Sequence, residues 1–486
     1  MTLPAIVIAA VLAAATSVHF PVSTNDPQAQ AAIDRGLFLY YAYNGDGAAR
    51  SFSEAASREP GLAVAFWGIA LAAGPDLNTP LTAAQFAVAQ RASRHAVELS
   101  AGASERERSF VAIMARRYAG TFKDWNADDD AYRQAMTSFA QSSHDENAEL
   151  LAAEALLEHG GLSWENGQLS TGESRTALEL VAAVLRDDPS NVMANHLCIH
   201  LYDLASDRLP ALPCAQRLDA AMFPAQAEHL AHMPAHYWIE TGGYRAALAS
   251  SERAYALLLQ LEGTNDDAEH VRRYLKHDIA VGYSAAMMLG NYATAQVWSA
   301  RMDIAYDTSF DAVTALRFGR YSEAYAAPDS AYGNPAVRGL AALHLGRDKE
   351  ADAIAKPMIA KPPSAGYLPQ LFLAREAEAS GRFGEAGTWI ADAARNQHAD
   401  FTGELIPILP AQEALGFFEL RRGDASEAIA AFTRTLALYP NDPRALFGLA
   451  SALAADGQNA AAAASRSRFM REWDGADTGL AGADLP

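Results

Sequence analysis

A set of four positions near the C-terminus recurs 34 residues further along the chain, and this repetition constrains the fold more than any other feature. The paired positions are Leu415 and Leu449, Gly416 and Ala450, Gly423 and Gly457, and Ala428 and Ala462. Small residues let two helices cross closely, and glycine allows a tight turn between them. Such a unit cannot bury its apolar face alone, so copies must stack. The repetition predicts stacked helical hairpins.

The same turn pattern extends through most of the chain. A glycine is followed five residues later by an alanine at Gly242, Gly290, Gly319, Gly346, Gly381, Gly423 and Gly457. A period of 34 residues is that of the tetratricopeptide repeat. The intervals between turns are irregular, so only the units near the C-terminus are expected to be regular repeats. We predict an all-α, tetratricopeptide-like α-solenoid of degenerate antiparallel hairpins with almost no sheet.

Five parts are predicted along the chain. They are a signal peptide (1–17), N-terminal helical repeats (28–190), histidine-rich helical repeats (191–300), C-terminal tetratricopeptide repeats (301–475) and a disordered tail (476–486). The apolar run Leu3–Ala15 is too short to span a bilayer and ends in small residues suited to cleavage. It predicts an exported protein, periplasmic or secreted. An uncleaved anchor and a buried helix are the alternatives, and no membrane-spanning segment is expected after cleavage.

Charge and cysteine content restrict the partners and the compartment. The formal net charge of −20 would repel a phosphate backbone, so we expect no nucleic-acid partner. The chain has two cysteines, Cys198 and Cys214, which could form a disulfide in an oxidising compartment. The alternative is a pair of small buried apolar residues, as free cysteine usually is.

Histidines concentrate in the middle of the chain. Of 13 histidines, seven lie between positions 196 and 277: His196, His200, His229, His232, His236, His270 and His277. On a helix, His196, His200 and Asp203 would share one face, and the 229–236 segment repeats these spacings of three and four. Pro234 interrupts that second stripe and could turn His236 away from His229. If the hairpins stack, the two stripes could face each other across a groove.

Two interpretations of this cluster remain open. In the first, His196, His200, His229, His232, His236 and His277 are candidate ligands of copper, zinc or iron, with Asp203 as a carboxylate ligand. Tyr274 precedes His277 by three positions and could assist it, whereas His270 is expected at the surface. In the second, the histidines are core residues, hydrogen-bonded to one another and to buried carboxylates such as Asp203, Glu228 or Glu154. A metal-free catalytic or ligand pocket is a further alternative.

The paired histidine motifs resemble those of a bacterial family of exported tetratricopeptide-repeat proteins. The two stretches read Asn-His-Leu-Cys-Ile-His-Leu-Tyr-Asp at 195–203 and Glu-His-Leu-Ala-His-Met-Pro-Ala-His at 228–236. All five histidines match the family pattern. The family's tyrosine pair is replaced by Leu197-Cys198, its glutamate by Asp203 and its glycine by Glu228. The resemblance covers roughly residues 30 to 300 and implies the repeat fold and a shared histidine-lined groove.

Two functional hypotheses follow. The first is an exported scaffold that binds a protein or peptide through its concave groove, as solenoids commonly do. The second is a histidine-ligated transition-metal protein or metalloenzyme with its site in the 196–277 region. Whether the chain is an enzyme is left open by its sequence.

Overall fold

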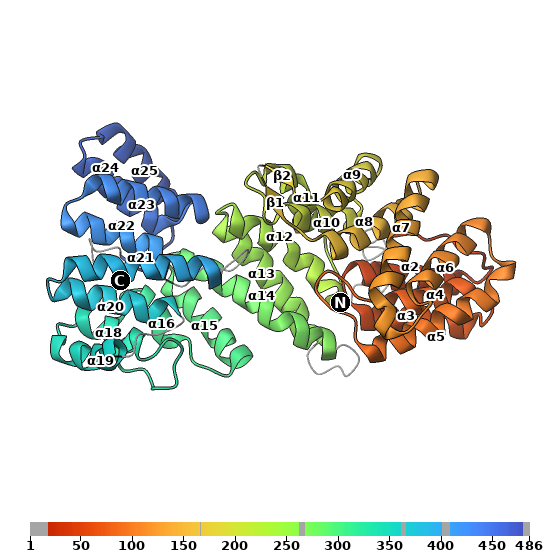
Figure 1. Ribbon diagram of the computed structural model, residues 1–486, viewed down its shortest axis with the longest axis horizontal. Helices are drawn as coiled ribbons and strands as arrows, with labels where there is room; N and C mark the ends of the chain where they lie inside the picture. The colour runs from red at the N-terminus through yellow and green to blue at the C-terminus, as the bar shows by residue number, and fades with distance from the viewer. Residues whose placement is uncertain (1–17, 166, 262–267, 361–365, 401–408, 480–486) are drawn as a thin grey trace, which may run out of the picture. The chain divides into compact units, whose positions relative to one another are not determined.

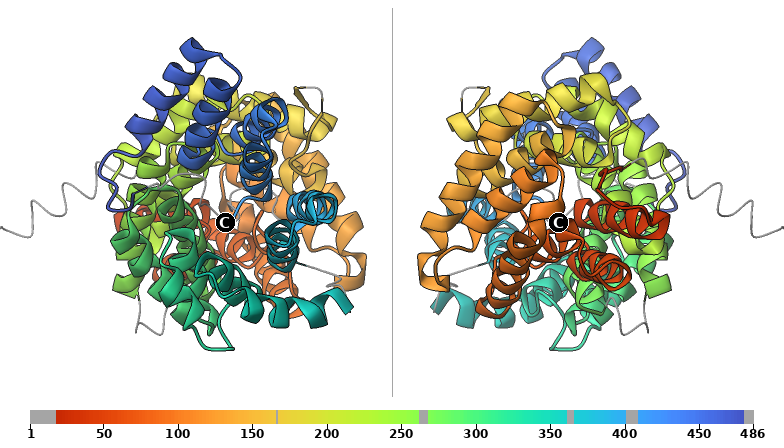
Figure 2. Two further views of the ribbon diagram at one scale, coloured as in Figure 1. Left: turned by 90° about the vertical axis from the view of Figure 1, so that its left-hand side faces the viewer. Right: turned by 90° about the vertical axis from the view of Figure 1, so that its right-hand side faces the viewer.

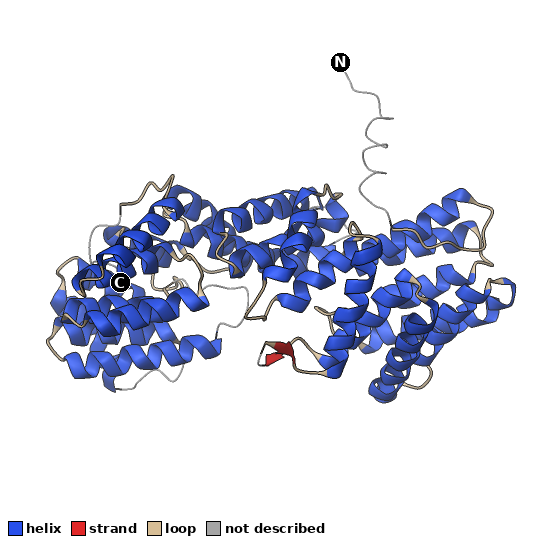
Figure 3. Ribbon diagram, turned by 90° about the horizontal axis from the view of Figure 1, so that it is seen from above, coloured by secondary structure: helices blue, strands red, loops and turns tan. Residues whose placement is uncertain are grey.

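The computed structural model describes residues 18–165, 167–261, 268–360, 366–400 and 409–479. Within these ranges the chain is almost entirely helical, as Figure 3 makes plain, and the only paired strands are two two-residue segments. The predicted all-α tetratricopeptide-like solenoid is confirmed. The chain divides into two compact units, residues 1–237 with 253–274, and residues 238–252 with 275–486.

The first unit contains most of the elements that precede the second histidine stripe (Figure 1). They are α2 (Pro27–Tyr41), α3 (Gly45–Arg58), α4 (Ala63–Ala72), α5 (Ala83–Leu99), η1 (Ser100–Gly102), α6 (Glu105–Arg117), η2 (Phe122–Asp124), α7 (Trp125–Ser143), α8 (Glu146–Gly160), β1 (Trp164–Glu165), β2 (Gln168–Leu169), α9 (Gly172–Asp187), α10 (Val192–Tyr202), η3 (Leu209–Ala211), α11 (Leu212–Ala220) and η4 (Ala225–Ala227). Strands β1 and β2 form an antiparallel hairpin.

Three helices are divided between the units, and the rest belong to the second unit. The divided helices are α12 (Glu228–Glu240), α13 (Tyr244–Leu261) and α14 (Ala268–Met288). The others are α15 (Tyr292–Tyr306), α16 (Asp311–Arg317), α17 (Tyr321–Tyr325), α18 (Ala336–His344), α19 (Asp348–Ala360), α20 (Tyr367–Ala379), α21 (Phe383–Asp400), α22 (Ala411–Arg422), α23 (Ala425–Leu438), α24 (Pro443–Ala455) and α25 (Asn459–Glu472). Helices α22 to α25, in blue in Figure 2, pack as consecutive neighbours.

Helix starts follow local capping chemistry. Thr82 and Ser104 begin α5 and α6 with capping boxes, in which the side chains of Gln85 and Glu107 reach back to the cap residues. Asn191 begins α10 by accepting a hydrogen bond from the Ala194 amide at 2.9 Å. These caps satisfy amide groups that the first helical turn leaves without partners.

An aromatic ring between two glycines sets the distance between successive helices. Phe432 on α23 lies 16 positions from both Gly416 and Gly448, and a Cβ at Gly448 would stand 2.2 Å from its ring. The same spacing recurs in the first unit, where the Phe52 ring excludes a Cβ at Gly36 and at Gly68. The arrangement reappears far apart in the sequence because each hairpin repeats one packing solution.

The structure also bears on the predicted ends and boundaries of the chain. The proposed signal peptide, 1–17, lies outside the described residues. Part of the predicted tail is held in place, because Asp477 accepts hydrogen bonds from the amides of Tyr292 and Ala293; positions 480–486 lie outside the described residues. The two units do not coincide with the three predicted repeat ranges. Among the described residues, no helix combines the length and apolarity needed to cross a membrane.

Gly448→Ala should destabilise the second unit by about 1–3 kcal/mol, because the new methyl group displaces the Phe432 ring from a packed core. Gly384→Ala is the matched control. Gly384 lies in α21, and a Cβ there meets no atom within 4 Å. The control should be neutral or stabilising by up to about 1 kcal/mol. Urea unfolding midpoints measure both, and equal midpoints for the two variants would contradict the packing argument.

Candidate metal centre

Helix α10 presents His196 and His200 from one face. Every residue from Val192 to Leu201 is buried, so both imidazoles lie in a water-poor interior. His196 is fully buried and His200 is 7% exposed. A disulfide joins Cys198, between the two histidines, to Cys214 on α11. The helix that carries the first histidine stripe is therefore tied covalently to its neighbour.

Helix α12 presents the second stripe. It runs without interruption through Pro234, and the imidazole rings of His229 and His232 lie 6.2 Å apart between centroids. The rings of His232 and His236 are 4.7 Å apart. The proline therefore does not separate the three histidines, because the chain stays helical from Glu228 to Glu240.

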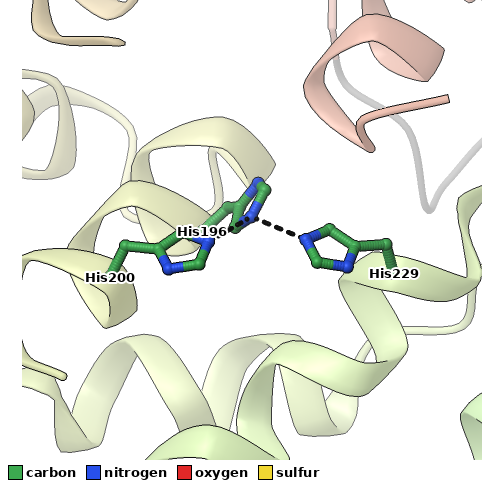
Figure 4. Close-up of side chains that lie close together, drawn as sticks. All are labelled: His196, His200 and His229. Atoms are coloured by element: carbon green, nitrogen blue, oxygen red, sulfur yellow. Dashed lines mark hydrogen bonds between the residues drawn. The ribbon is translucent and has the colours of Figure 1, made fainter. Parts of the chain in front are cut away.

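Three imidazole nitrogens converge in the first unit. The Nε2 atom of His196 lies 3.1 Å from His200 Nε2 and 3.2 Å from His229 Nε2. Figure 4 shows the three rings turned toward this common point, two from α10 and one from α12. One ligand atom from each of the three residues lies within 4.8 Å of the others. The two predicted stripes thus do meet, through three of their five histidines.

The contacts of the Nδ1 atoms of His196 and His200 determine the tautomers of these two rings. His196 Nδ1 lies 3.0 Å from the Tyr41 carbonyl oxygen, and His200 Nδ1 lies 3.0 Å from Asp203 Oδ2. A carbonyl or an ionised carboxylate only accepts hydrogen bonds, so each Nδ1 carries the proton. In the neutral rings both Nε2 atoms then present lone pairs, and these face each other at 3.1 Å.

Two facing lone pairs require a cation between them. A proton on His200 would serve, and so would a metal ion. Burial is the main cause that lowers the pKa of His196 well below its usual range, followed by the charge of His200. Burial also lowers the pKa of His229 well below its usual range, with His196 as the next cause. The site therefore keeps these two imidazoles neutral, as metal ligation requires.

The nitrogen separations suit a metal ion. With metal–nitrogen bonds of about 2.0–2.1 Å, separations near 3.1–3.2 Å correspond to ligand–metal–ligand angles of about 100°. An Nδ1–H bonded to a carboxylate or a backbone carbonyl is also the usual second contact of a metal-bound histidine. His200–Asp203 and His196–Tyr41 supply one of each kind. Asp203 thus orients a candidate ligand through its Nδ1.

Two tyrosines enclose the centre. The Tyr43 ring lies 4.5 Å from the His196 ring and stacks on the His229 ring at 5.3 Å. Tyr274 packs against the other side of His229, with ring centroids 4.5 Å apart. The hydroxyl of Tyr43 is buried and has no hydrogen-bond partner among the described residues. A buried phenol thus lies in a ring that packs on two candidate ligands.

The turn between α2 and α3 places Tyr43 against the histidines, which the sequence analysis did not predict. Tyr43 has a left-handed backbone, with φ of 55°. The next residue, Asn44, accepts a hydrogen bond from the Gly47 amide at 2.8 Å and donates one to the Gln226 carbonyl at 2.9 Å. Asn44 thereby joins the turn to the segment that leads into α12. The tyrosine-rich run at 40–43 was the sole sequence signal for this contact.

The remaining candidates do not belong to the three-nitrogen centre. His232 and His236 are buried on α12, and the His236 ring is 6.0 Å from the His200 ring. His277 lies on the part of α14 that belongs to the second unit, so it is not assigned to a site in the first. The surface position expected for His270 is wrong. Its ring is buried because its Nε2 pairs with Glu228 Oε1 at 2.5 Å.

The structural network anticipated for the histidines is present in part. His270 pairs with Glu228 and His200 with Asp203, as that interpretation supposed. Glu154 instead accepts a hydrogen bond from the Tyr40 hydroxyl at 2.6 Å. Carboxylates therefore account for the outer contacts of the cluster, whereas the three converging Nε2 atoms contact one another, as that interpretation also supposed.

Comparison with known proteins supports the repeat assignment. The tetratricopeptide-repeat family model matches residues 409–452, which cover α22, α23 and most of α24. No curated protein sequence matches the chain significantly.

The solved structures that match this chain have low overall structural similarity to it. The Cut9–Hcn1 hetero-tetramer of APC/C matches with TM-score 0.34 and 13% identity, over 82% of this chain and 78% of that one. A human IFIT1 dimer with PPP-AAAA matches with TM-score 0.31 and 12% identity, over 90% and 88%. Yeast Tom70 matches with TM-score 0.26 and 12% identity, over 95% and 94%. These values carry no functional conclusion.

In metal-free protein labelled with ¹⁵N-histidine, His196 should be the Nδ1–H tautomer, because the Tyr41 carbonyl can only accept. Long-range ¹H–¹⁵N correlation spectra measure this directly, with the resonance assigned by its loss in His196→Asn. An Nε2–H form of His196 would remove the argument for facing lone pairs.

Proposed function

We propose that the protein binds a transition-metal ion through the Nε2 atoms of His196, His200 and His229. The observation that carries the proposal is the 3.1 Å separation of the Nε2 atoms of His196 and His200, two rings whose Nδ1 atoms each lie 3.0 Å from a hydrogen-bond acceptor. A metal ion between these two nitrogens would remove their repulsion and would also bind His229 Nε2. A proton shared by His196 and His200 would do the first but would not bind His229. Imidazole donors suit zinc, copper and iron.

Three protein ligands leave a coordination position for water or substrate, which is the pattern of catalytic rather than closed structural zinc sites. The ring of Tyr43, which packs on His196 and His229, would screen such an ion from solvent. Proposed export to the periplasm or the exterior agrees with the Cys198–Cys214 disulfide, because disulfides persist in oxidising compartments.

Metal analysis tests the proposal. Untagged protein, stripped with a chelator and then incubated with Zn²⁺, Cu²⁺ or Fe²⁺, should retain metal that His196→Ala/His200→Ala and His229→Gln lose. Asp203→Asn should weaken binding about 10- to 100-fold, because it removes the carboxylate that orients His200. Elemental analysis gives the stoichiometry, and Cu²⁺ electron paramagnetic resonance should show coupling to three nitrogens.

The exposed pair His95→Ala/His144→Ala is the matched control and should keep its metal. Circular dichroism verifies that each variant remains helical. Equal metal retention in wild-type and folded His196→Ala/His200→Ala protein would refute the site, as would the absence of bound metal with all three ions.

A peptide-binding scaffold is the second candidate, and one cavity favours it. A recess of about 720 Å³ lies along α2 and α3 in the first unit and carries both charge signs, with Arg35 and Arg50 beside Asp34 and Glu54. Peptides selected on the wild type from a display library should lose binding in Arg50→Glu/Glu54→Arg, with metal content unchanged. Undiminished binding of the selected peptides to that variant would exclude this recess as the groove.

A further inference from the structure

A second cavity in the first unit lies apart from the ligand histidines. It has a volume of about 630 Å³ and is formed by the loop 75–81 after α4, the start of α7 with the preceding η2, and Glu158 on α8. Pockets of about 300–1,000 Å³ are typical of small-molecule sites. We call it the acidic cavity.

Negative charge dominates its lining. Three carboxylates, Asp76, Asp129 and Glu158, line the cavity, and Lys123 is the one cationic lining residue. Buried Arg117 stands behind the wall, with its Nε 2.7 Å from Asp129 and its Nη2 2.6 Å from Glu158. Two carboxylates, Asp129 and Glu158, share one guanidinium, and Lys123 is exposed to solvent. The interior wall therefore keeps an excess of negative charge.

The wall also has acceptor atoms without partners. Glu158 has a side chain only 10% exposed, and its Oε1 has no hydrogen-bond partner among the described residues. The hydroxyl oxygen of Thr79, in the loop 75–81, is also buried and has no hydrogen-bond partner among the described residues. A buried acceptor without a donor costs about 1–3 kcal/mol, so a ligand that donates to either atom gains from it.

The charge of Glu158 is incompletely balanced by Arg117. Burial raises the pKa of the Glu158 carboxyl to about 7, against the opposing effect of Arg117. One turn earlier on α8, burial and then the charge of Glu158 raise the pKa of Glu154 well above its usual range. A cation in the cavity would offset the cost of an ionised Glu158.

The remaining walls select the kind of cation. Trp125 and Phe122 line the cavity together with proline and leucine side chains. Aromatic faces stabilise ammonium groups, and apolar walls hold a hydrocarbon body. The aromatic rings favour an organic cation over a bare metal ion, because they interact with an ammonium group and supply no oxygen ligand.

We propose that the acidic cavity binds an organic primary ammonium group, whose N–H donors meet Glu158 and Thr79 while its apolar body packs on Trp125 and Phe122. Such a group belongs to free amines and to lysine side chains of proteins. The site is independent of the proposed metal centre, because it uses none of the ligand histidines.

Calorimetric titration of the full-length protein tests this with phenethylamine, its neutral counterpart 2-phenylethanol and Nα-acetyl-lysine amide. Phenethylamine should bind at least tenfold more tightly than the alcohol. Glu158→Gln and Asp76→Asn should each weaken amine binding at least tenfold, because each removes one negative charge at nearly constant shape. Asp76→Asn retains the Oδ1 that accepts from the Asn78 amide, so the loop keeps its fold.

Glu98→Gln, an exposed acid on α5, is the matched control and should bind the amine like the wild type. Binding of phenethylamine supports a free amine as ligand, and binding of the lysine amide alone supports a protein lysine. Binding of neither, equal affinity for amine and alcohol, or wild-type affinity in both acid variants would overturn the proposal. Metal content should be unchanged in all three variants, so this test fails or succeeds separately from that of the metal centre.

Discussion

The hydrogen bond from His196 Nδ1 to the Tyr41 carbonyl decides which nitrogen of His196 faces the other imidazoles. Because the carbonyl accepts and cannot donate, the proton is held on Nδ1 and the lone pair points inward. The contact of His200 with Asp203 does the same for the second ring. If one of these two rings carried its proton on Nε2 instead, the contact between His196 and His200 would be an ordinary hydrogen bond, and the case for a cation would disappear.

The α2–α3 turn makes that bond available at some cost. A left-handed tyrosine such as Tyr43 is unfavourable by about 1–3 kcal/mol. The hydrogen bonds of Asn44 and the burial of the Tyr43 ring against His196 and His229 offset this cost. A strained residue that packs on two candidate ligands is what a preorganised site requires, because strain persists only where the surroundings determine the conformation.

Charge links the proposed metal centre to the rest of the first unit. Three neutral imidazoles supply no negative charge to balance a divalent ion. Burial and then the charges of Glu154 and Asp76 raise the pKa of Tyr43, which lies beside His196. These carboxyls act on the Tyr43 phenol, which therefore stays protonated beside the candidate ligands. The same group of acids forms and backs the acidic cavity.

The sequence by itself determined the helical repeat and the sharing of one helix face by His196 and His200. Both follow from local rules, namely the 34-residue period and the 3.6-residue helical turn. The tertiary structure decided that His229 joins that pair, that Tyr41 supplies the acceptor, and that His270 is buried. These outcomes depend on contacts across many intervening residues, such as Tyr41 with His196 and Asn44 with Gln226. Periodicity fixes which side of a helix a residue occupies, but the packing of distant hairpins fixes what that side meets.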